Sequence, residues 1–330
     1  MGKAYIVDYD IYVPDTFVSH EELAASTGLP DWVVRDKMGI LRKPVERRLS
    51  VAEMARKAAE RLLRRNPRAN VGIVAYAGSD FKDKYVWDIA PKVMGELGLG
   101  SAYGVDISMQ CASSIVALDL LAAKLRTAAV GFHALMVAAT KQSMIVDYSD
   151  KASSFMYDFS DGAAAVLLGN SGGKYEVLES SVLTDGRFSD VVYQGLGERF
   201  MDSSGDYMLR VNRTEEFSKV FEEVSLRNFA WVVRDALAKS GLSVDDVDYL
   251  ALLHMKRSFH YGILKELGIP PDKSIYLDYY GHMQSIDPFL SLRLAEERGI
   301  IRRGSVAVLV SAGTGWTWGA TVIRRVHGET

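Results

Sequence analysis

Cysteine is almost absent from this sequence, because Cys111 is the only one among 330 residues. A single cysteine excludes a disulfide framework and a cysteine-based metal cluster, and it fits a reducing compartment. Long apolar runs are also missing, since no run reaches the ~18 residues of a membrane span. The opening residues, MGKAYIVDYDIY, are typical of a β-strand rather than of a signal peptide. We therefore expect a cytoplasmic globular protein.

A strong excess of one charge is missing as well, because 39 lysines and arginines face 42 aspartates and glutamates. No lysine-rich tract stands out, which argues against nucleic acid as the main partner. The basic residues between Arg42 and Arg48 are interpreted as a solvated face. No pair of histidines has the spacing of metal ligands within one helix, so we predict no metal site.

What the sequence does have is a regular alternation of predicted strands and helices. In its first part we predict strands at residues 4–9 and 134–139 and a helix at 112–125. The later part resumes with a helix at 215–239 and a strand at 249–253. This alternation predicts an α/β fold with a largely parallel sheet in each half.

An internal repeat relates the two halves. When the chain is shifted against itself by about 172 residues, Leu118 and Leu120 fall on Leu290 and Leu292. The best candidate for a linker is the NSGG sequence that begins at Asn170. We therefore divide the chain into an N-terminal half, residues 1–170, and a C-terminal half, residues 171–330.

The repeat also pairs two strand-to-helix turns that carry reactive side chains. Cys111 lies at a predicted helix start, where unpaired backbone N–H groups and the helix dipole stabilise a thiolate. In a pseudo-two-fold arrangement this turn faces the turn at His282, and His254 follows a predicted strand. A thiol with two imidazoles can act as a nucleophile with its bases and hydrogen-bond donors. The alternatives stay open, namely a buried structural thiol, a core histidine at 254 and a simple turn at 282.

Six motifs along the chain occur together. They are DWVVRDKMGI near residue 31, the Cys111 turn, DGAAAVLLG at 161, LLHMKRS at 252, YGHMQS at 280 and AGTGWTWGATVI at 312. This set resembles the thiolase superfamily, and within it the ketoacyl-ACP synthase III branch of condensing enzymes. The resemblance covers essentially the whole chain. It implies a thiolase fold, with two pseudo-symmetric α/β halves in five αβαβα layers, and a homodimer.

The resemblance also implies roles for single residues. Cys111 matches the nucleophile that takes the acyl group from acyl-CoA, and His254 matches the histidine of the family's HQAN motif. His282 stands where the family has an asparagine, so the set is Cys-His-His, as in the elongating synthases I and II. The backbone N–H groups of Cys111 and Thr314 would form the oxyanion hole. The implied reaction is decarboxylative condensation of an acyl-CoA primer with a malonyl thioester, carried by CoA or by acyl carrier protein, in fatty acid biosynthesis.

Substrate-binding residues follow from the same resemblance. Trp32 matches the tryptophan that stacks on the CoA adenine, with Arg35 or Lys37 as its basic neighbour. Lys256 and Arg257 are candidates for a phosphate contact. A further loop near Val86 and Trp87 would reach the partner's pocket and limit the acyl length. Acyl-CoA enters as a substrate, and we expect no bound cofactor.

Other activities on this scaffold are weighed against the same residues. A thiolase needs a second cysteine in the C-terminal glycine loop, which here reads SAGTGWTWG. Hydroxymethylglutaryl-CoA synthase needs a glutamate in the loop after the strand at 71–76, and that loop reads AYAGSD. An inactive scaffold subunit is disfavoured, because the cysteine and both histidines are present. The strongest alternative is a non-condensing acyltransferase that passes the acyl group from Cys111 to a hydroxyl or an amine.

Overall fold

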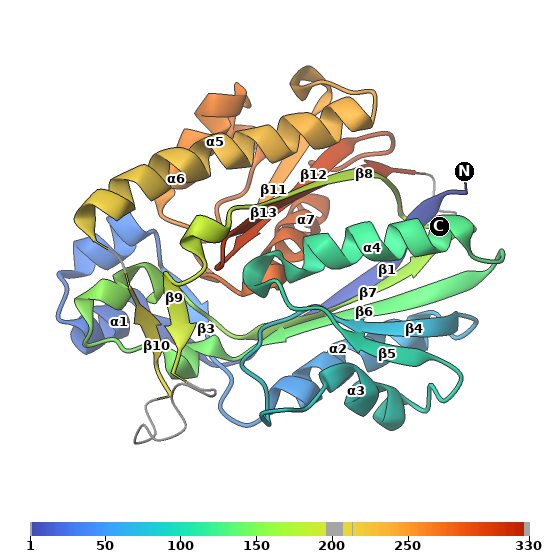
Figure 1. Ribbon diagram of the computed structural model, residues 1–330, viewed down its shortest axis with the longest axis horizontal. Helices are drawn as coiled ribbons and strands as arrows, with labels where there is room; N and C mark the ends of the chain where they lie inside the picture. Colours follow the sequence, from blue (N-terminus) through green and yellow to red (C-terminus); the bar gives the residue numbers. More distant parts are fainter. Residues whose placement is uncertain (1, 196–206, 213, 327–330) are drawn as a thin grey trace.

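Helical and sheet layers alternate through the molecule, five in all (Figure 1). The computed structural model describes residues 2–195, 207–212 and 214–326. The outer helical layers hold α2 (Val51–Arg65) and α3 (Ile89–Leu97) on one side, and α5 (Glu215–Lys239) and α6 (Arg257–Leu267) on the other. The central helical layer holds α4 (Ser113–Thr127) and α7 (Asp287–Glu297). The five-layered α/β arrangement expected from the sequence is therefore confirmed.

The described strands of the two sheet layers join into one sheet, in the order β11-β12-β13-β8-β1-β7-β6-β4-β5. The N-terminal half supplies β1 (Ala4–Tyr12), β4 (Asn70–Tyr76), β5 (Tyr103–Asp106), β6 (Phe132–Thr140) and β7 (Gly162–Gly169). The C-terminal half supplies β8 (Tyr175–Thr184), β11 (Tyr249–Leu252), β12 (Val306–Gly313) and β13 (Thr317–Arg325).

The prediction of largely parallel sheets is wrong. β4 is parallel to β5 and to β6, and β11 is parallel to β12. The pairs β1–β7, β6–β7, β8–β13 and β12–β13 are antiparallel. The physical reason is clearest at β12 and β13, which are joined by the short turn 314–316. A turn of that length allows an antiparallel hairpin, whereas a parallel neighbour needs a crossover of a dozen or more residues.

Strand β1 joins the two halves of the sheet. Its residues from Tyr5 onward pair with β7, while Ala4, Tyr5 and Ile6 also pair with Val177, Glu176 and Tyr175 of β8. Strand β7 ends at Gly169 and β8 begins at Tyr175, so the predicted linker lies between them. We keep the division at residue 170 as a proposal about architecture.

Three buried apolar clusters fill the spaces between the layers. The central cluster surrounds α4 and α7 and includes Ile115, Leu118 and Phe289. One outer cluster lies under α2 and α3, and the other lies under α5 and α6. Burying one such leucine or phenylalanine stabilises the fold by roughly 1.5–3 kcal/mol. The central layer is therefore held firmly in place, and it carries the turns on which the reactive side chains lie.

The turns that open α4 and α7 have the same backbone form. Gln110 and Gln284 have φ values of 51° and 58°, and each begins a 3₁₀ turn that leads into its helix. Left-handed φ values are uncommon for residues other than glycine, so their recurrence marks a structural repeat. The two glutamines are 174 residues apart, so the local register differs from the sequence shift. Ser285, rather than His282, is the structural counterpart of Cys111.

Smaller elements border the end of the molecule where these turns lie. They are β2 (Phe17–Ser19), α1 (His20–Thr27), a π-helical segment (Val33–Met38), β3 (Arg42–Pro44), β9 (Val192–Gln194) and β10 (Leu209–Val211). Among the described helices, none is both long and apolar enough to cross a bilayer.

Candidate active site

Cys111 lies in the 3₁₀ turn Gln110–Ala112, directly before α4. Its side chain is buried, with 4% of the residue exposed. The Cys111 carbonyl accepts a hydrogen bond from Ser311 Oγ of β12 at 2.5 Å. Nearby, Ser113 Oγ accepts from the backbone N–H of Met109 at 2.9 Å. These bonds fix the turn, so the thiol has a defined direction at the beginning of the central helix.

His282 contacts the thiol directly. Its Nε2 lies 3.2 Å from Cys111 Sγ, and its Nδ1 lies 2.6 Å from Asp287 Oδ2. Asp287 opens α7 and accepts from the backbone N–H of Met283 with its other oxygen, at 2.7 Å. Because a carboxylate only accepts, Nδ1 of His282 carries a proton, and Nε2 is the atom that exchanges a proton with the thiol.

The electrostatics of this pair favour a charged imidazole. Burial on its own lowers the pKa of His282, but the adjacent Cys111 thiolate and Asp287 carboxylate outweigh it and raise that pKa well above its ordinary value. A thiolate beside an imidazolium is the reactive form of a cysteine. Cys111 is thus arranged as a nucleophile with its proton acceptor already in contact.

His254 follows β11 and has a carboxylate partner of its own. Its Nδ1 lies 2.8 Å from Asp158 Oδ2, and its Nε2 lies 3.4 Å from the carbonyl oxygen of Gly39. Its backbone N–H donates to Asp287 Oδ2 at 2.8 Å, so Asp287 connects the two histidines. The structure therefore brings His254 and His282 together at one end of the central layer.

The segment that presents Asp158 is held by a buried lysine. Lys43 of β3 is 1% exposed, and its Nζ donates to the carbonyls of Tyr157 and Phe159 at 2.6 and 2.7 Å. A third bond, at 2.8 Å, goes to the hydroxyl of Tyr148. The interpretation of residues 42–48 as a solvated face is therefore wrong for Lys43. The physical reason is that three acceptors replace the water which a lysine ammonium loses on burial.

Cys111, His254, His282 and Thr314 line one cavity of about 260 Å³, whose walls are mostly apolar. The glycine that precedes Thr314 explains how the β12 end approaches the nucleophile. A Cβ atom on Gly313 would overlap the Met109 carbonyl oxygen and would lie 3.0 Å from the backbone nitrogens of both Cys111 and Ala112. Only a glycine allows the β12–β13 turn to pass so close to the Cys111 N–H. The position of Thr314 is compatible with an oxyanion hole made by the backbone N–H groups of Cys111 and Thr314. This oxyanion hole stays a prediction.

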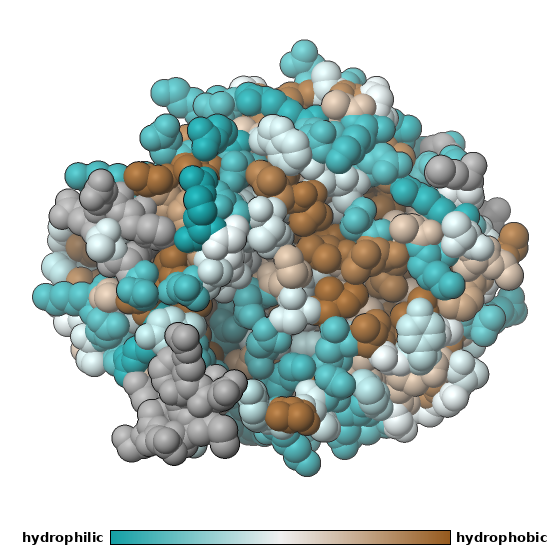
Figure 2. Space-filling model, in the orientation of Figure 1, coloured by the Kyte–Doolittle hydropathy of each residue, from teal (hydrophilic) through white to brown (hydrophobic). Residues whose placement is uncertain are grey.

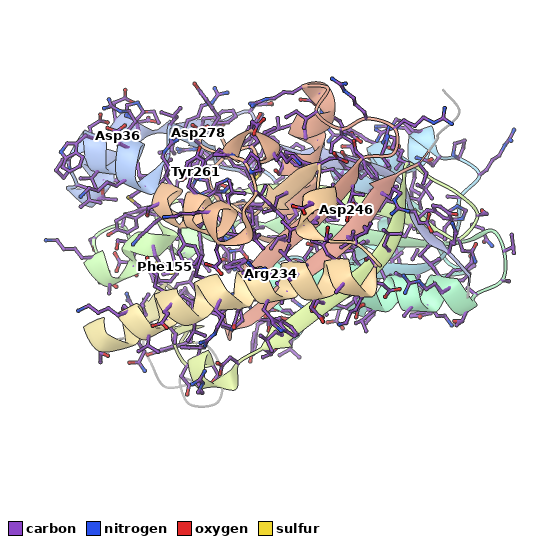
Figure 3. The ribbon with its side chains drawn as sticks, turned by 90° about the horizontal axis from the view of Figure 1, so that it is seen from above. Asp36, Phe155, Arg234, Asp246, Tyr261 and Asp278 are labelled. Carbon is purple, nitrogen blue, oxygen red and sulfur yellow. The ribbon has the colours of Figure 1, made fainter. Side chains whose placement is uncertain are left out.

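A second cavity, of about 710 Å³ and here called the outer cavity, adjoins the first. Phe155, Asp158 and Lys256 line both cavities. Asp36, Phe155 and Tyr261 come from three separate segments to its walls (Figure 3). The two cavities are therefore neighbours, and Asp158 belongs to the wall that they share.

The predicted substrate-binding residues are distributed over different places. Lys37, Lys256 and Arg257 line the outer cavity. Trp32 is half exposed beside it, with Lys37 Nζ 4.9 Å from its ring centroid. Arg35 is bound to its neighbour Asp36 by two hydrogen bonds of 2.9 and 3.0 Å. Lys37 is therefore a better candidate than Arg35 for a phosphate contact.

Trp87 lies elsewhere. It lines a third cavity, of about 810 Å³, together with the rest of the 80–88 loop. Thr314 borders this cavity as well as the one that holds Cys111. Trp87 is therefore not among the residues that line the Cys111 cavity of its own chain, and its role in a partner's pocket stays a prediction.

Comparison with known proteins identifies the family. The model of 3-oxoacyl-[acyl-carrier-protein] synthase III matches residues 105–186, and the model of its C-terminal part matches residues 237–325. The β-ketoacyl-[acyl-carrier-protein] synthase III of Sphingopyxis alaskensis is 30% identical over 320 residues, covering 94% of this chain and 96% of the relative. The chain belongs to the β-ketoacyl-[acyl-carrier-protein] synthase III family.

Solved structures agree with this membership at the level of the fold. The 3-oxoacyl-[acyl-carrier-protein] synthase III from Aquifex aeolicus VF5 matches with a TM-score of 0.84 at 23% identity, covering 98% of this chain and 100% of that one. The priming β-ketosynthase from the R1128 polyketide pathway matches with a TM-score of 0.86 at 19% identity, covering 99% and 97%. This synthase III-like protein is a condensing acyltransferase with a thiolase-like α/β fold.

Sequence reasoning missed both carboxylates of this synthase III site. Asp287 carried a usable signal, because it follows His282 by only five residues and precedes a proline, a residue that is common in the first turn of a helix. Asp158 is 96 residues from His254, so no local spacing marks it. Lys43 was missed because burial of a lysine cannot be read from a segment rich in basic residues.

Proposed function

We propose that Cys111 carries the acyl group of an acyl-CoA primer and that a malonyl thioester then condenses with it. The observation that carries this proposal is the contact between Cys111 Sγ and His282 Nε2 at 3.2 Å, with Asp287 behind the imidazole. Family membership supports the reaction class, a synthase III-like condensation on acyl-CoA and acyl-carrier thioesters in fatty acid biosynthesis.

The first half-reaction needs no group beyond this pair. His282 Nε2 takes the thiol proton, and the Cys111 sulfur forms a bond to the acyl carbon while the bond from that carbon to CoA sulfur breaks. The CoA sulfur leaves with the bonding electrons and takes the proton back from His282. CoA departs as a thiol, the imidazole is neutral again, and the acyl group stays on Cys111.

The second half-reaction uses a malonyl thioester. Its carboxylate carbon separates as CO₂, and the electron pair of the broken bond forms an enolate, whose oxygen an imidazole N–H can stabilise. The enolate carbon attacks the acyl carbon, and Cys111 sulfur leaves as a thiolate. One solvent proton taken up by His282 restores the resting pair. Cys111 and Thr314 backbone N–H groups would hold the acyl oxygen during both transfers.

The outer cavity fits the carrier of these thioesters. Lys37, Lys256 and Arg257 supply positive charge at its walls, and Trp32 supplies an exposed aromatic face beside it. Phosphate groups and an adenine ring are the chemical groups that such residues bind. We assign the primer to acyl-CoA, and the malonyl carrier to CoA or acyl carrier protein.

A non-condensing transfer of the acyl group to a hydroxyl or an amine is the second candidate. It is favoured by Asp158, whose buried Oδ1 has no hydrogen-bond partner among the described residues although Asp158 lines the cavity of Cys111. A free carboxylate oxygen can accept from the O–H or N–H of such an acceptor. Release of CO₂ distinguishes the two reactions.

A homodimer and a cytoplasmic location complete the proposal. Strand β5 lies at an edge of the described sheet, and its residues Tyr103 and Val105 are exposed. Apolar side chains also gather over α4, on the same face of the molecule (Figure 2). An open edge strand is a template for pairing with another chain, here a second copy.

The test is to incubate the protein with a panel of acyl-CoA primers and to measure the mass of the peptide that contains Cys111. We expect an acyl adduct on wild type and none on Cys111→Ala. Malonyl-CoA or malonyl-acyl carrier protein is then added, and CO₂ and ketoacyl product are measured. Failure of every primer to form an adduct would overturn both candidates. An adduct without CO₂ release, but with transfer to an amine or hydroxyl, would favour the second.

A further inference from the structure

Each imidazole of the site is hydrogen-bonded to its own carboxylate. These two histidine–carboxylate pairs, here called the two couples, differ in what the second ring nitrogen faces. His282 Nδ1 is bound to Asp287 and its Nε2 to the thiol. His254 Nδ1 is bound to Asp158, and its Nε2 faces the Gly39 carbonyl rather than sulfur. The chain separations differ too, since Asp287 is local to His282 whereas Asp158 reaches His254 from the other half of the chain.

His254 faces a hydrogen-bond acceptor at each of its two ring nitrogens. A carboxylate and a carbonyl oxygen both accept, and neither can donate. Nδ1 lies 2.8 Å from Asp158 Oδ2 and Nε2 lies 3.4 Å from the Gly39 carbonyl oxygen, so the geometry places an acceptor beside each ring nitrogen. His282 differs, because its Nε2 faces the Cys111 sulfur, with which it exchanges a proton. The two histidines thus have different partners, one the nucleophile and the other a backbone carbonyl.

Asp158 is itself held rigidly and is placed to meet a substrate. Lys43 Nζ donates to the carbonyls on either side of it, and its own carbonyl accepts from the His282 backbone N–H at 2.8 Å. Its side chain is more than nine-tenths buried, and it lines both the cavity of Cys111 and the outer cavity. Asp158 is thus accessible from both cavities, while His254 lines the one that holds Cys111.

We propose that the two couples divide the reaction, with Asp287 serving acylation of Cys111 through His282 and Asp158 serving loss of CO₂ through His254. This inference rests on the proposed condensation. Asp158 is a positioning residue that keeps His254 charged and its Nε2–H aimed at the cavity. As CO₂ leaves the malonyl thioester, the electron pair moves onto the enolate oxygen, which replaces the Gly39 carbonyl as the acceptor of that N–H. The positive charge of His254 balances the negative charge that the enolate gains.

The experiment measures the two half-reactions separately in Asp158→Asn, Asp287→Asn and the control Asp272→Asn, which removes an exposed carboxylate. Asparagine keeps the size and an acceptor oxygen but removes the charge. We expect Asp158→Asn to acylate Cys111 within about twofold of wild type, while kcat for malonyl decarboxylation falls about 100-fold or more with KM little changed. Asp287→Asn should slow acylation by a similar factor, and Asp272→Asn should change neither step.

Equal losses in both half-reactions for Asp158→Asn would overturn the division, as would a loss confined to KM. If wild type itself forms no acyl adduct, the proposed function fails. That outcome can be told apart from the two Asp158→Asn outcomes, because it is measured on wild type alone. Acylation at the normal rate also reports that the variant is folded. If Asp158→Asn does not fold, the test is NMR spectroscopy of the wild type labelled with ¹⁵N-histidine. Its His254 ring nitrogens, assigned through His254→Gln, should have imidazolium shifts at neutral pH, and a neutral tautomer would contradict the proposal.

Discussion

At the residue scale, Lys43 gives the site a buried positive charge that touches no substrate. Its three ammonium protons meet three acceptors, two backbone carbonyls and the hydroxyl of Tyr148. Burial lowers the pKa of Lys43 to about 8, although the nearby carboxylates of Asp158 and Asp161 act in the opposite direction. Lys43 therefore holds the 157–159 segment most firmly at and below neutral pH, when all three protons are present.

The depressed pKa of Lys43 predicts a pH-dependent stability. Between pH 8 and about 10.5 the folded protein binds fewer protons at Lys43 than the unfolded chain, so raising the pH favours the folded state. We expect the unfolding free energy of wild type, minus that of Lys43→Met, to rise by up to about 3 kcal/mol between those pH values. Denaturant unfolding of both proteins at pH 7.5 and 10 measures this difference. A difference that stays flat or falls would contradict a lowered pKa.

Single residues also show what sequence could predict about the site. Cys111, His254 and His282 were predicted because each follows a strand at a turn, and such turns meet in a duplicated α/β fold. Asp158 could not be predicted in this way, since its position depends on how the 3₁₀ segment Lys151–Met156 folds over the pocket. The protonation of a histidine depends on such partners, so it was not readable from the sequence either.

At the element scale, the close approach of β12 to the turn before α4 sets the geometry of the nucleophile. The element types were largely predictable from hydrophobic periodicity, and the helix 215–239 agrees with its predicted bounds. The pairing of the strands was not predictable, because periodicity identifies a segment as a strand but does not show whether its neighbour is parallel or antiparallel. The turn 314–316 decides that direction for β12 and β13.

This close approach makes Gly313 intolerant of a side chain. We expect Gly313→Ala to lower the unfolding free energy by about 1–3 kcal/mol and to slow acylation, because the new Cβ overlaps the Met109 carbonyl oxygen in the turn that carries Cys111. Thermal unfolding and the rate of adduct formation on Cys111 measure the two effects. Gly95→Ala is the matched control, since Gly95 lies within α3 with open space around it, and helix propensity there predicts a gain of about 0.5–1 kcal/mol. Equal behaviour of the two variants would show that the approach is not tight.

At the scale of the whole molecule, the sheet has an open edge at strand β5. Strand β5 pairs with β4 on one side, and Tyr103 is 56% exposed. The sequence could suggest a dimer through its family resemblance alone, because an edge strand is defined by the complete strand order. That order follows from pairings between residues far apart in the chain.

We expect Val105→Lys to convert a dimer of this protein into monomers, because a charge on an edge strand blocks pairing with a second strand. Sedimentation equilibrium of wild type and variant at the same concentrations measures the change. Val220→Lys is the control, since Val220 is similarly exposed but lies on α5 in the outer layer of the other half. A wild type that stays monomeric, or a variant that remains dimeric, would exclude β5 as the interface.

The shared strand β1 has a further consequence, for cooperativity. Although β1 belongs to the N-terminal half, its first residues pair with β7 of that half on one side and with β8 of the C-terminal half on the other. An opening of the C-terminal half that removes β8 uncovers one edge of β1, and an opening of the N-terminal half removes β1 itself. Each half therefore loses sheet partners when the other opens, and the two should melt together as one unit. The division near residue 170 therefore separates two halves of the architecture, but the two halves should unfold in a single cooperative transition.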